Sequence, residues 1–158
     1  GRYARKGVEL MLTLTEIATA INDKLIEILP NIPIQSKDIS EGFERPSLFV
    51  DFDGTTTSAY IGGKRERTIH VIIYFFPTDI YNNKIEILEV QEALEQAFSG
   101  QFKIKEGFVV YPFDVNSVKV DGVLQVSFDI YTLENNDSSQ SGDNEELMQE
   151  LNMNIRKE

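Results

Sequence analysis

The sequence predicts an α+β domain in which two α-helices pack on a mainly antiparallel β-sheet, followed by a flexible acidic C-terminal tail. Two segments repeat apolar residues at helical spacing, and the segments between and after them alternate with a period of two. The chain of 158 residues is 41% hydrophobic, which suffices for one packed domain but is short for two. We expect this domain at residues 11–133, a cloning remnant or flexible leader at residues 1–10, and a polar linker with a short amphipathic helix at residues 134–158.

The first helix is predicted to begin at Thr13, because Thr13 and Glu16 match the capping box, in which each side chain accepts a backbone N–H of the other residue. Pro30 is expected to end the helix, since proline cannot continue it. The apolar stripe that should face the core consists of Leu14, Ile17, Ala18, Ile21, Leu25 and Ile28.

Two strands are predicted to follow. In residues 48–53, the two faces hold Leu48, Val50 and Phe52 on one side and Phe49, Asp51 and Asp53 on the other. In residues 67–76, one face holds Ile69, Val71, Ile73 and Phe75, and the other holds Thr68, His70, Ile72, Tyr74 and Phe76. This second face is too apolar for open water. Shorter strands are expected at residues 32–36 and 108–111.

The second helix is predicted between Asn83 and Gly100, with Glu86 in its first turn. After it, a hairpin over residues 116–133 turns at Asp121 and Gly122, a dipeptide that readily takes positive φ. We expect Gly122 to hold positive φ within a three-residue loop. That loop would set Val120 opposite Leu124 and Val118 opposite Val126, so that apolar faces match.

The composition disfavours several classes of site. The chain has no cysteine, and His70 is its one histidine, so thiolate chemistry, histidine triads and multi-histidine metal sites cannot be assembled within it. A net charge of −11 argues against a protein that binds the phosphates of a nucleic acid. No apolar segment approaches the ~20 residues that span a bilayer. We expect no cofactor, no specific nucleic-acid binding and no membrane contact, and a structural or interface role for His70.

Asp51 and Asp53, followed by Gly54 and Thr55, resemble the opening motif of the haloacid dehalogenase phosphatases. Those enzymes need a helical crossover after this motif, because their catalytic residues gather at the carboxyl ends of parallel strands. Here the next patterned segment is another strand, which predicts a hairpin. We interpret the motif as a solvated strand face that ends in a turn at Gly54, and keep a magnesium-dependent phosphatase only as an alternative that the context disfavours.

Four segments carry a resemblance to a known family: EGFERPS at residues 41–47, RTI and YFFP at residues 67–69 and 74–77, EVQEAL at residues 89–94, and DGVL with SF at residues 121–124 and 127–128. In order and spacing, over residues 12–133, they resemble the small tail terminator proteins of phages and prophages of Gram-positive bacteria. The tail from Glu134 onward is not part of the resemblance.

The resemblance implies an α+β structural protein without catalytic residues. It implies a hexameric ring that caps the tail tube, ends its growth and offers its other side to the head connector, or to a collar in headless tail-like particles. The implied partners are other copies of the chain, the tail tube protein, and the sheath, connector or collar. Such a protein assembles in the bacterial host cytoplasm and sits at the tail end or neck of the particle.

An interface for such a ring can be sought among apolar and basic side chains. Ile72 and Tyr74 lie on a strand face that two helices need not cover, and apolar surface of this kind commonly marks an interface. Basic side chains in an acidic chain suit acidic patches of a neighbour. The candidate subunit or tube interface consists of Phe43, Arg45, Arg65, Arg67, Ile72, Tyr74 and Phe76. Asp121 and Gly122 are predicted separately, as a structural turn.

Three alternatives stay open. The apolar face could be covered by a second layer within the monomer, and the basic residues could be solvated strand ends. The competing function is a small α+β module that binds a peptide or small ligand on the sheet face.

Overall fold

The computed structural model describes residues 12–36 and 44–135 of the chain. Its elements in chain order are α2 (Leu14–Ile28), β1 (Ser47–Tyr60), β2 (Lys64–Phe76), α3 (Lys84–Ala97), β3 (Phe102–Lys105), β4 (Phe108–Val110), β5 (Phe113–Val120) and β6 (Val123–Asn135). The predicted leader at residues 1–10 and the amphipathic helix of the tail lie outside the described residues. None of the described helices is long and apolar enough to cross a membrane.

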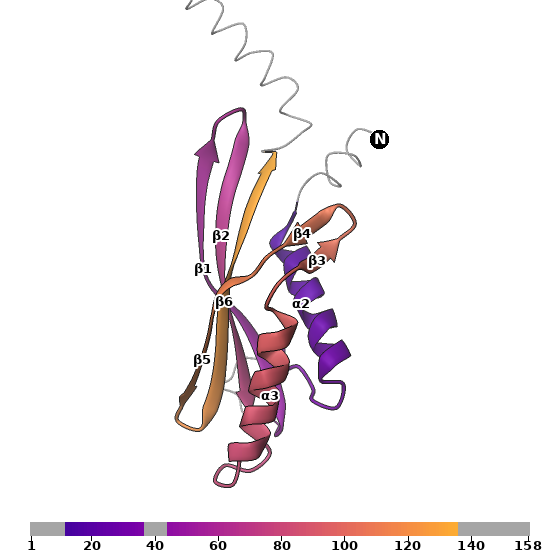
Figure 1. Ribbon diagram of the computed structural model, residues 1–158, viewed down its shortest axis with the longest axis vertical. Coiled ribbons are helices and arrows are strands. Elements are labelled where there is room, and N and C mark those ends of the chain that lie inside the picture. Colours follow the sequence, from indigo (N-terminus) through magenta and orange to yellow (C-terminus); the bar gives the residue numbers. More distant parts are fainter. Residues whose placement is uncertain (1–11, 37–43, 136–158) are drawn as a thin grey trace, which may run out of the picture.

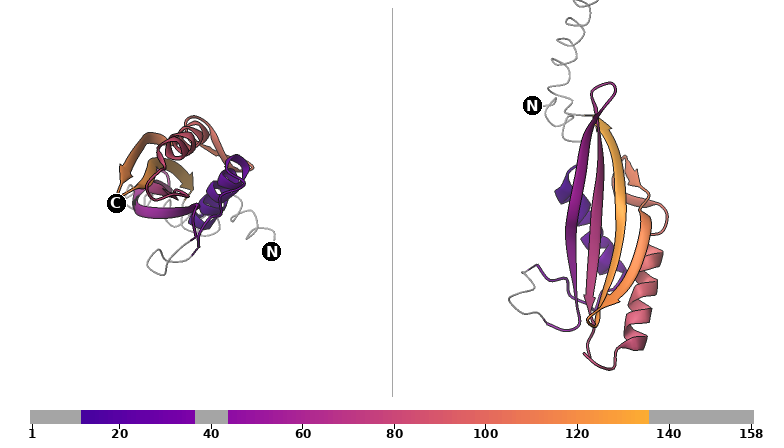
Figure 2. Two further views of the ribbon diagram at one scale, coloured as in Figure 1. Left: turned by 90° about the horizontal axis from the view of Figure 1, so that it is seen from below. Right: turned by 90° about the vertical axis from the view of Figure 1, so that its left-hand side faces the viewer.

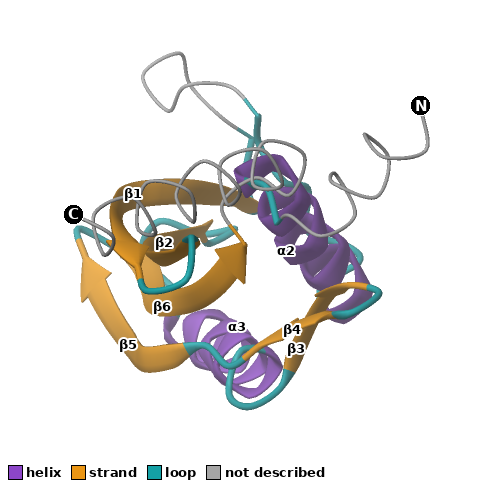
Figure 3. Ribbon diagram, turned by 90° about the horizontal axis from the view of Figure 1, so that it is seen from above, coloured by secondary structure: helices purple, strands orange, loops and turns teal. Residues whose placement is uncertain are grey.

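The described strands form a four-stranded sheet in the order β1-β2-β6-β5, with antiparallel neighbours throughout, and a two-stranded β3-β4 hairpin. Both helices and the β3-β4 hairpin lie on the same side of the curved sheet (Figures 1 and 3). The right-hand view of Figure 2 shows the opposite side of the sheet, which no described helix covers. The predicted α+β class, with a mainly antiparallel sheet packed by two helices, is confirmed.

The core fills the space between the helices and the covered face of the sheet. Ile17, Ile21 and Leu25 of α2 are completely buried there. The ring of Phe98, which follows α3, stacks on Phe128 of β6 at a centroid distance of 4.7 Å. Apolar burial of this kind is the main term that stabilises such a domain.

The predicted start of α2 is confirmed by its capping geometry. The Glu16 N–H donates to Thr13 Oγ1 at 3.1 Å, and the Thr13 N–H donates to Glu16 Oε1 at 3.0 Å. Leu14 lies at the margin of the predicted stripe, because its side chain is exposed.

The alternation predicted for β2 is also confirmed. Ile69, Val71, Ile73 and Phe75 are each fully buried. Ile72 and Tyr74 lie on the uncovered face and are only partly buried. The strand is longer than residues 67–76, because it begins at Lys64.

The predicted turn at Gly54 is wrong. The pairing register shifts between Phe52 and Gly54, so a β-bulge lies where the turn was expected. The strand then continues to Tyr60, and the turn falls at residues 61–63. A bulge inserts an unpaired residue and bends the strand without ending it, which local turn propensity does not distinguish.

The three-residue loop predicted for the β5-β6 hairpin is also wrong. Val120 pairs with Val123, and Val118 pairs with Gln125, so the loop has two residues. Asp121 has φ 52° and Gly122 has φ 79°, the pair of positive angles that a type I′ turn requires. The positive φ predicted for Gly122 is confirmed.

Three further boundaries differ from the prediction. Residues 32–36 form no strand, only a parallel bridge between Ile34 and Leu48. The strand expected at residues 108–111 is β4, and its partner β3 was not predicted. Strand β6 continues through Asn135, so Glu134 belongs to the sheet and not to the polar linker.

Candidate functional site

The uncovered face of the sheet carries partly exposed apolar side chains near the β5-β6 turn, which lies at the lower end of the sheet in Figure 1. The register places Phe49 of β1 opposite Tyr74 of β2, and their rings lie 6.0 Å apart. Ile72 lies two residues from Tyr74 on the same face. Two strands away, Val118 and Val120 of β5 are 44% and 43% exposed on this face, with Gln125 of β6 between Val118 and Tyr74. We call these five residues, Phe49, Ile72, Tyr74, Val118 and Val120, the open-face patch.

The two valines reach this face because of the two-residue turn. Their neighbours on β5 point the other way, toward α3: Ser117 Oγ donates to Glu95 Oε2 at 2.6 Å, and Lys119 Nζ donates to Asn83 Oδ1 at 3.2 Å. At these two positions the inward face of β5 is therefore polar, although Val115 packs against the core, and Val118 and Val120 face outward.

The Tyr74 hydroxyl is the ionisable group of the open-face patch. Partial burial raises the pKa of Tyr74, and the nearby carboxylates of Asp51 and Asp53 raise it further. Each of these causes disfavours the tyrosinate anion. Tyr74 therefore stays a neutral hydrogen-bond donor beside apolar neighbours, a side chain type that is common at protein interfaces.

Beyond the patch the same face becomes polar. His70 Nδ1 lies 2.7 Å from Asp129 Oδ1 across β2 and β6. Further up, the Tyr131 hydroxyl donates to Glu66 Oε2 at 2.8 Å. His70 thus has a carboxylate partner within the chain, and the structural or interface role expected for it stays a prediction.

A buried charged cluster lies on the other face, where β2 and β6 meet the start of α2. Glu134 Oε1 accepts from Arg65 Nη2 at 2.5 Å and lies 3.3 Å from Arg67 Nη2. Arg67 Nη2 also donates to the Leu12 carbonyl at 2.6 Å, and the Leu12 N–H donates to Glu134 Oε2 at 3.1 Å. The pKa of Arg67 is lowered, mainly by burial of its side chain. The negative charge of Glu134 raises this pKa, and the positive charge of Arg65 lowers it. The cluster ties the segment before α2 to the sheet.

This cluster corrects the expectation for the two arginines. Arg67 is a buried residue, and Arg65 and Arg67 both pair with Glu134 of their own chain. Their positions share the two-residue period of Ile69 and Val71, so they point to the covered face and not toward a neighbour. The prediction that Arg67 is an exposed interface residue is therefore wrong.

The other predicted interface residues differ in where they lie. Phe76 is 4% exposed, so it is also wrong as an available side chain. Arg45 lies beside it, with its guanidinium 6.0 Å from the Phe76 ring centroid and its Nη1 donating to the Pro77 carbonyl at 3.1 Å. Phe43 lies outside the described residues. Only Ile72 and Tyr74 belong to the open-face patch.

The phosphatase-like motif lies on this sheet without the surroundings of a phosphatase. Strand β1 leads through a tight turn into the antiparallel strand β2, which confirms the predicted hairpin. Asp51 is half-buried beside the patch, and Asp53 is exposed at the bulge. Within the described residues, no three His, Cys, Asp or Glu side chains gather as a metal site.

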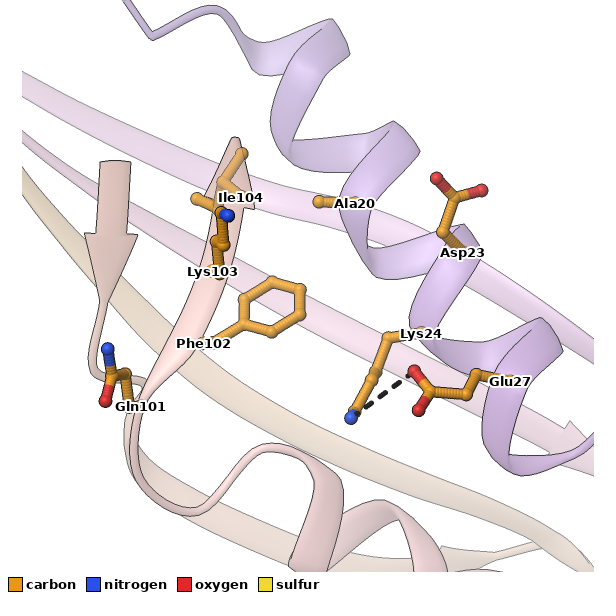
Figure 4. A pocket seen from close by; sticks show the side chains of 8 residues that line it. All are labelled: Ala20, Asp23, Lys24, Glu27, Gln101, Phe102, Lys103 and Ile104. Carbon is orange, nitrogen blue, oxygen red and sulfur yellow. Dashed lines mark ion pairs between the residues drawn. The ribbon is translucent and has the colours of Figure 1, made fainter. Parts of the chain in front are cut away.

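A hollow of about 460 Å³ lies between α2 and β3, on the side of the molecule that carries the helices (Figure 4). Phe102 points toward α2, and Lys24 reaches into the space beside it. Lys24 Nζ lies 3.5 Å from Glu27 Oε2, an exposed ion pair within one helix. The remaining lining residues are Asp23, Gln101 and Lys103, which are polar or charged, and Ala20 and Ile104.

Two features were missed from the sequence, and a local signal existed for one of them. Thr132 and Glu134 continue the two-residue period of Phe128 and Ile130, which predicts that Glu134 points inward. The outward direction of Val118 and Val120 follows only from the turn type. A count along β6 from its buried residues would have found the first feature but not the second.

Comparison with known proteins adds one match. The family described as phage tail terminator protein matches residues 16–142. No curated protein matches the chain.

Proposed function

The chain belongs to the phage tail terminator protein family, and on that premise we propose that it forms a hexameric ring that caps the tail tube and stops its polymerisation. Membership gives the chain a structural role in a phage tail, in contact with other tail or virion proteins. We further propose that the free side of the ring joins the head connector, or a collar in headless particles, and that a sheath is a neighbour in contractile tails.

The observation that carries this proposal is the open-face patch. Both described helices cover one face of the sheet, so Phe49, Ile72 and Tyr74 remain partly exposed on the other. Complete burial of such a side chain contributes roughly 1.5–3 kcal/mol, so several together outweigh the loss of freedom at an interface. We propose that this patch is covered in the assembled tail.

Charge is consistent with a ring through which DNA passes. The chain has 26 acidic and 15 basic residues, and phosphates are repelled by acidic surfaces. We propose that the lumen of the ring is acidic, which would keep passing DNA from adhering.

The test removes the protein from its producing particle and measures tail length by electron microscopy. We expect overlong tubes of variable length that do not join their connector or collar. Normal, uniform tubes that still join it would overturn the proposed function.

A matched pair of variants then tests the patch. Ile72→Glu places a charge in the open-face patch, whereas Ile85→Glu places one on an exposed isoleucine of α3, on the covered side of the sheet. We expect Ile72→Glu to fail to restore tail length and Ile85→Glu to restore it, with both proteins folded by circular dichroism. Equal restoration by the two variants would show that the patch is not used.

A further inference from the structure

The described sheet has two unpaired edges at the same end, the upper end in Figure 1. Strand β1 is an edge strand, and among the described residues the backbone hydrogen bonds to its outer side are those at Leu48. Strand β5 covers β6 only as far as Asp129. Residues 55–60 of β1 and residues 131–135 of β6 therefore present backbone N–H and C=O groups without strand partners in the described part of the chain.

Within residues 12–36 and 44–135, the lower parts of the two edge strands are protected, and the upper part of β1 is not. At the lower end, residues 33–35 cover Leu48, a bulge interrupts β1 before Gly54, and β5 has an irregular register between Phe113 and Asn116. Natural sheets use bulges, charges, proline or covering segments to prevent pairing at an edge. Residues 55–60, TTTSAY, contain neither charge nor proline, and their register with β2 is regular. This part of the edge is suited to pairing.

We propose that residues 55–60 of one copy pair with residues 131–135 of the next copy in the ring. The inference rests on the proposed function, because it assigns the contact between ring subunits. A closed ring needs two different complementary surfaces on each subunit, and the two edges of one sheet face in opposite directions.

The register supports this pairing. Ser58 of β1 and Leu133 of β6 both pair with Glu66 of β2, so the two free edges lie at the same level. Both strands run antiparallel to β2 and hence parallel to one another. Copies related by rotation about an axis along the strands would therefore join through a parallel pair of strands.

Side chains at these edges favour the contact as well. Tyr60, Tyr131 and Leu133 are 47%, 43% and 44% exposed on the uncovered face. In the same-level register, pairing of the edges would place Leu133 of one copy beside Ser58 of the next, with Tyr60 on the diagonal to Leu133. Contacts of an aromatic ring with an apolar side chain across two strands stabilise a sheet.

The absence of cysteine from the chain allows a direct test by engineered disulfides. Ser58→Cys is combined with Leu133→Cys, and separately with Tyr131→Cys, so that two adjacent registers are covered. Within one chain β2 separates these positions by roughly 9–10 Å, which exceeds the span of a disulfide. Any bond between them must therefore join two copies.

Each variant is produced in the particle, checked for uniform tail length and oxidised. We expect at least one double variant to give a ladder of cross-linked species up to the hexamer on gels without reductant. The single variants, and the control pair Ser58→Cys with Asn116→Cys on the protected edge, should remain monomeric. If Ser58→Cys fails to restore tail length, Thr56→Cys takes its place on the same face of β1.

Three results would overturn the inference. Dimers from Ser58→Cys alone would indicate pairing of β1 with β1, and cross-links to a different protein would indicate that the edge binds another tail component. Absence of any ladder in particles of uniform tail length would exclude the pairing while leaving the proposed function intact. By contrast, normal tails after deletion of the whole protein would overturn the proposed function itself.

Discussion

Replacing Glu134 by alanine is expected to destabilise the domain strongly, because its carboxylate is the anion between two arginines. The Glu134 side chain is 1% exposed, and it accepts hydrogen bonds from Arg65 and from the Leu12 N–H. Removing one partner of a buried ion pair lowers the free energy of unfolding by about 3–5 kcal/mol. The lower end applies here, because Arg65 reaches water and Arg67 keeps its bond to the Leu12 carbonyl.

Thermal and urea unfolding of the purified protein measure this effect. At about 2–4 °C per kcal/mol for a chain of this size, a loss of about 3 kcal/mol lowers Tm by roughly 6–12 °C. Glu106→Ala is the matched control, because Glu106 also pairs with a cation, Lys103 at 2.7 Å, but is exposed. We expect the control to change Tm little, since exposed pairs contribute little.

Glu134→Gln separates charge from shape. The amide keeps an oxygen for the Leu12 N–H but removes the negative charge, so its effect should lie between those of the control and of Glu134→Ala. A loss below about 1 kcal/mol for Glu134→Ala, the range of surface ion pairs, would refute the assignment of Glu134 to the folded domain.

Three other predictions concern the turn, the patch and the motif. Gly122→Val should lower the free energy of unfolding by about 1–3 kcal/mol, because valine is strained at φ 79°. A steric clash does not contribute, because no neighbouring atom lies within 4 Å of an added Cβ. An unchanged Tm would contradict the assigned turn. Tyr74 should ionise above the usual tyrosine pKa in a spectroscopic titration, and Asp51→Asn should lower that pKa. Because the unfolded chain releases this proton first, stability should fall as the pH rises above about 10 and through the raised pKa, and a pKa unaffected by Asp51→Asn would remove the carboxylate as a cause. No magnesium-dependent phosphate ester hydrolysis is expected, and turnover that disappears in Asp51→Asn would reverse this.

Much of the covered side of the fold could be predicted from local patterns. The capping box of Thr13 and Glu16 located the start of α2, and the alternation of Ile69, Val71 and Ile73 located the buried face of β2. These signals depend on residues that are close in sequence, so their outcome hardly depends on the remainder of the chain.

The candidate site was predicted less well, because exposure depends on distant partners. Ile72 and Tyr74 were assigned to the uncovered face, as the structure places them. Arg67 and Phe76 were assigned to the surface by residue type, yet Arg67 is enclosed by Glu134 and Leu12, and Phe76 lies beside Arg45 and is buried. The sequence does not show in advance which acidic side chain meets a buried arginine.

The sequence by itself determined the α+β class, the start of α2, the buried face of β2 and the position of the last hairpin. The register of that hairpin was decided by the tertiary structure. Asn83 and Glu95 of the α3 region accept hydrogen bonds from Lys119 and Ser117, so these two polar side chains turn inward and Val118 and Val120 turn outward. Matching apolar residues across two strands predicts the opposite register, because a pattern of two strands contains no information about the helix that covers them.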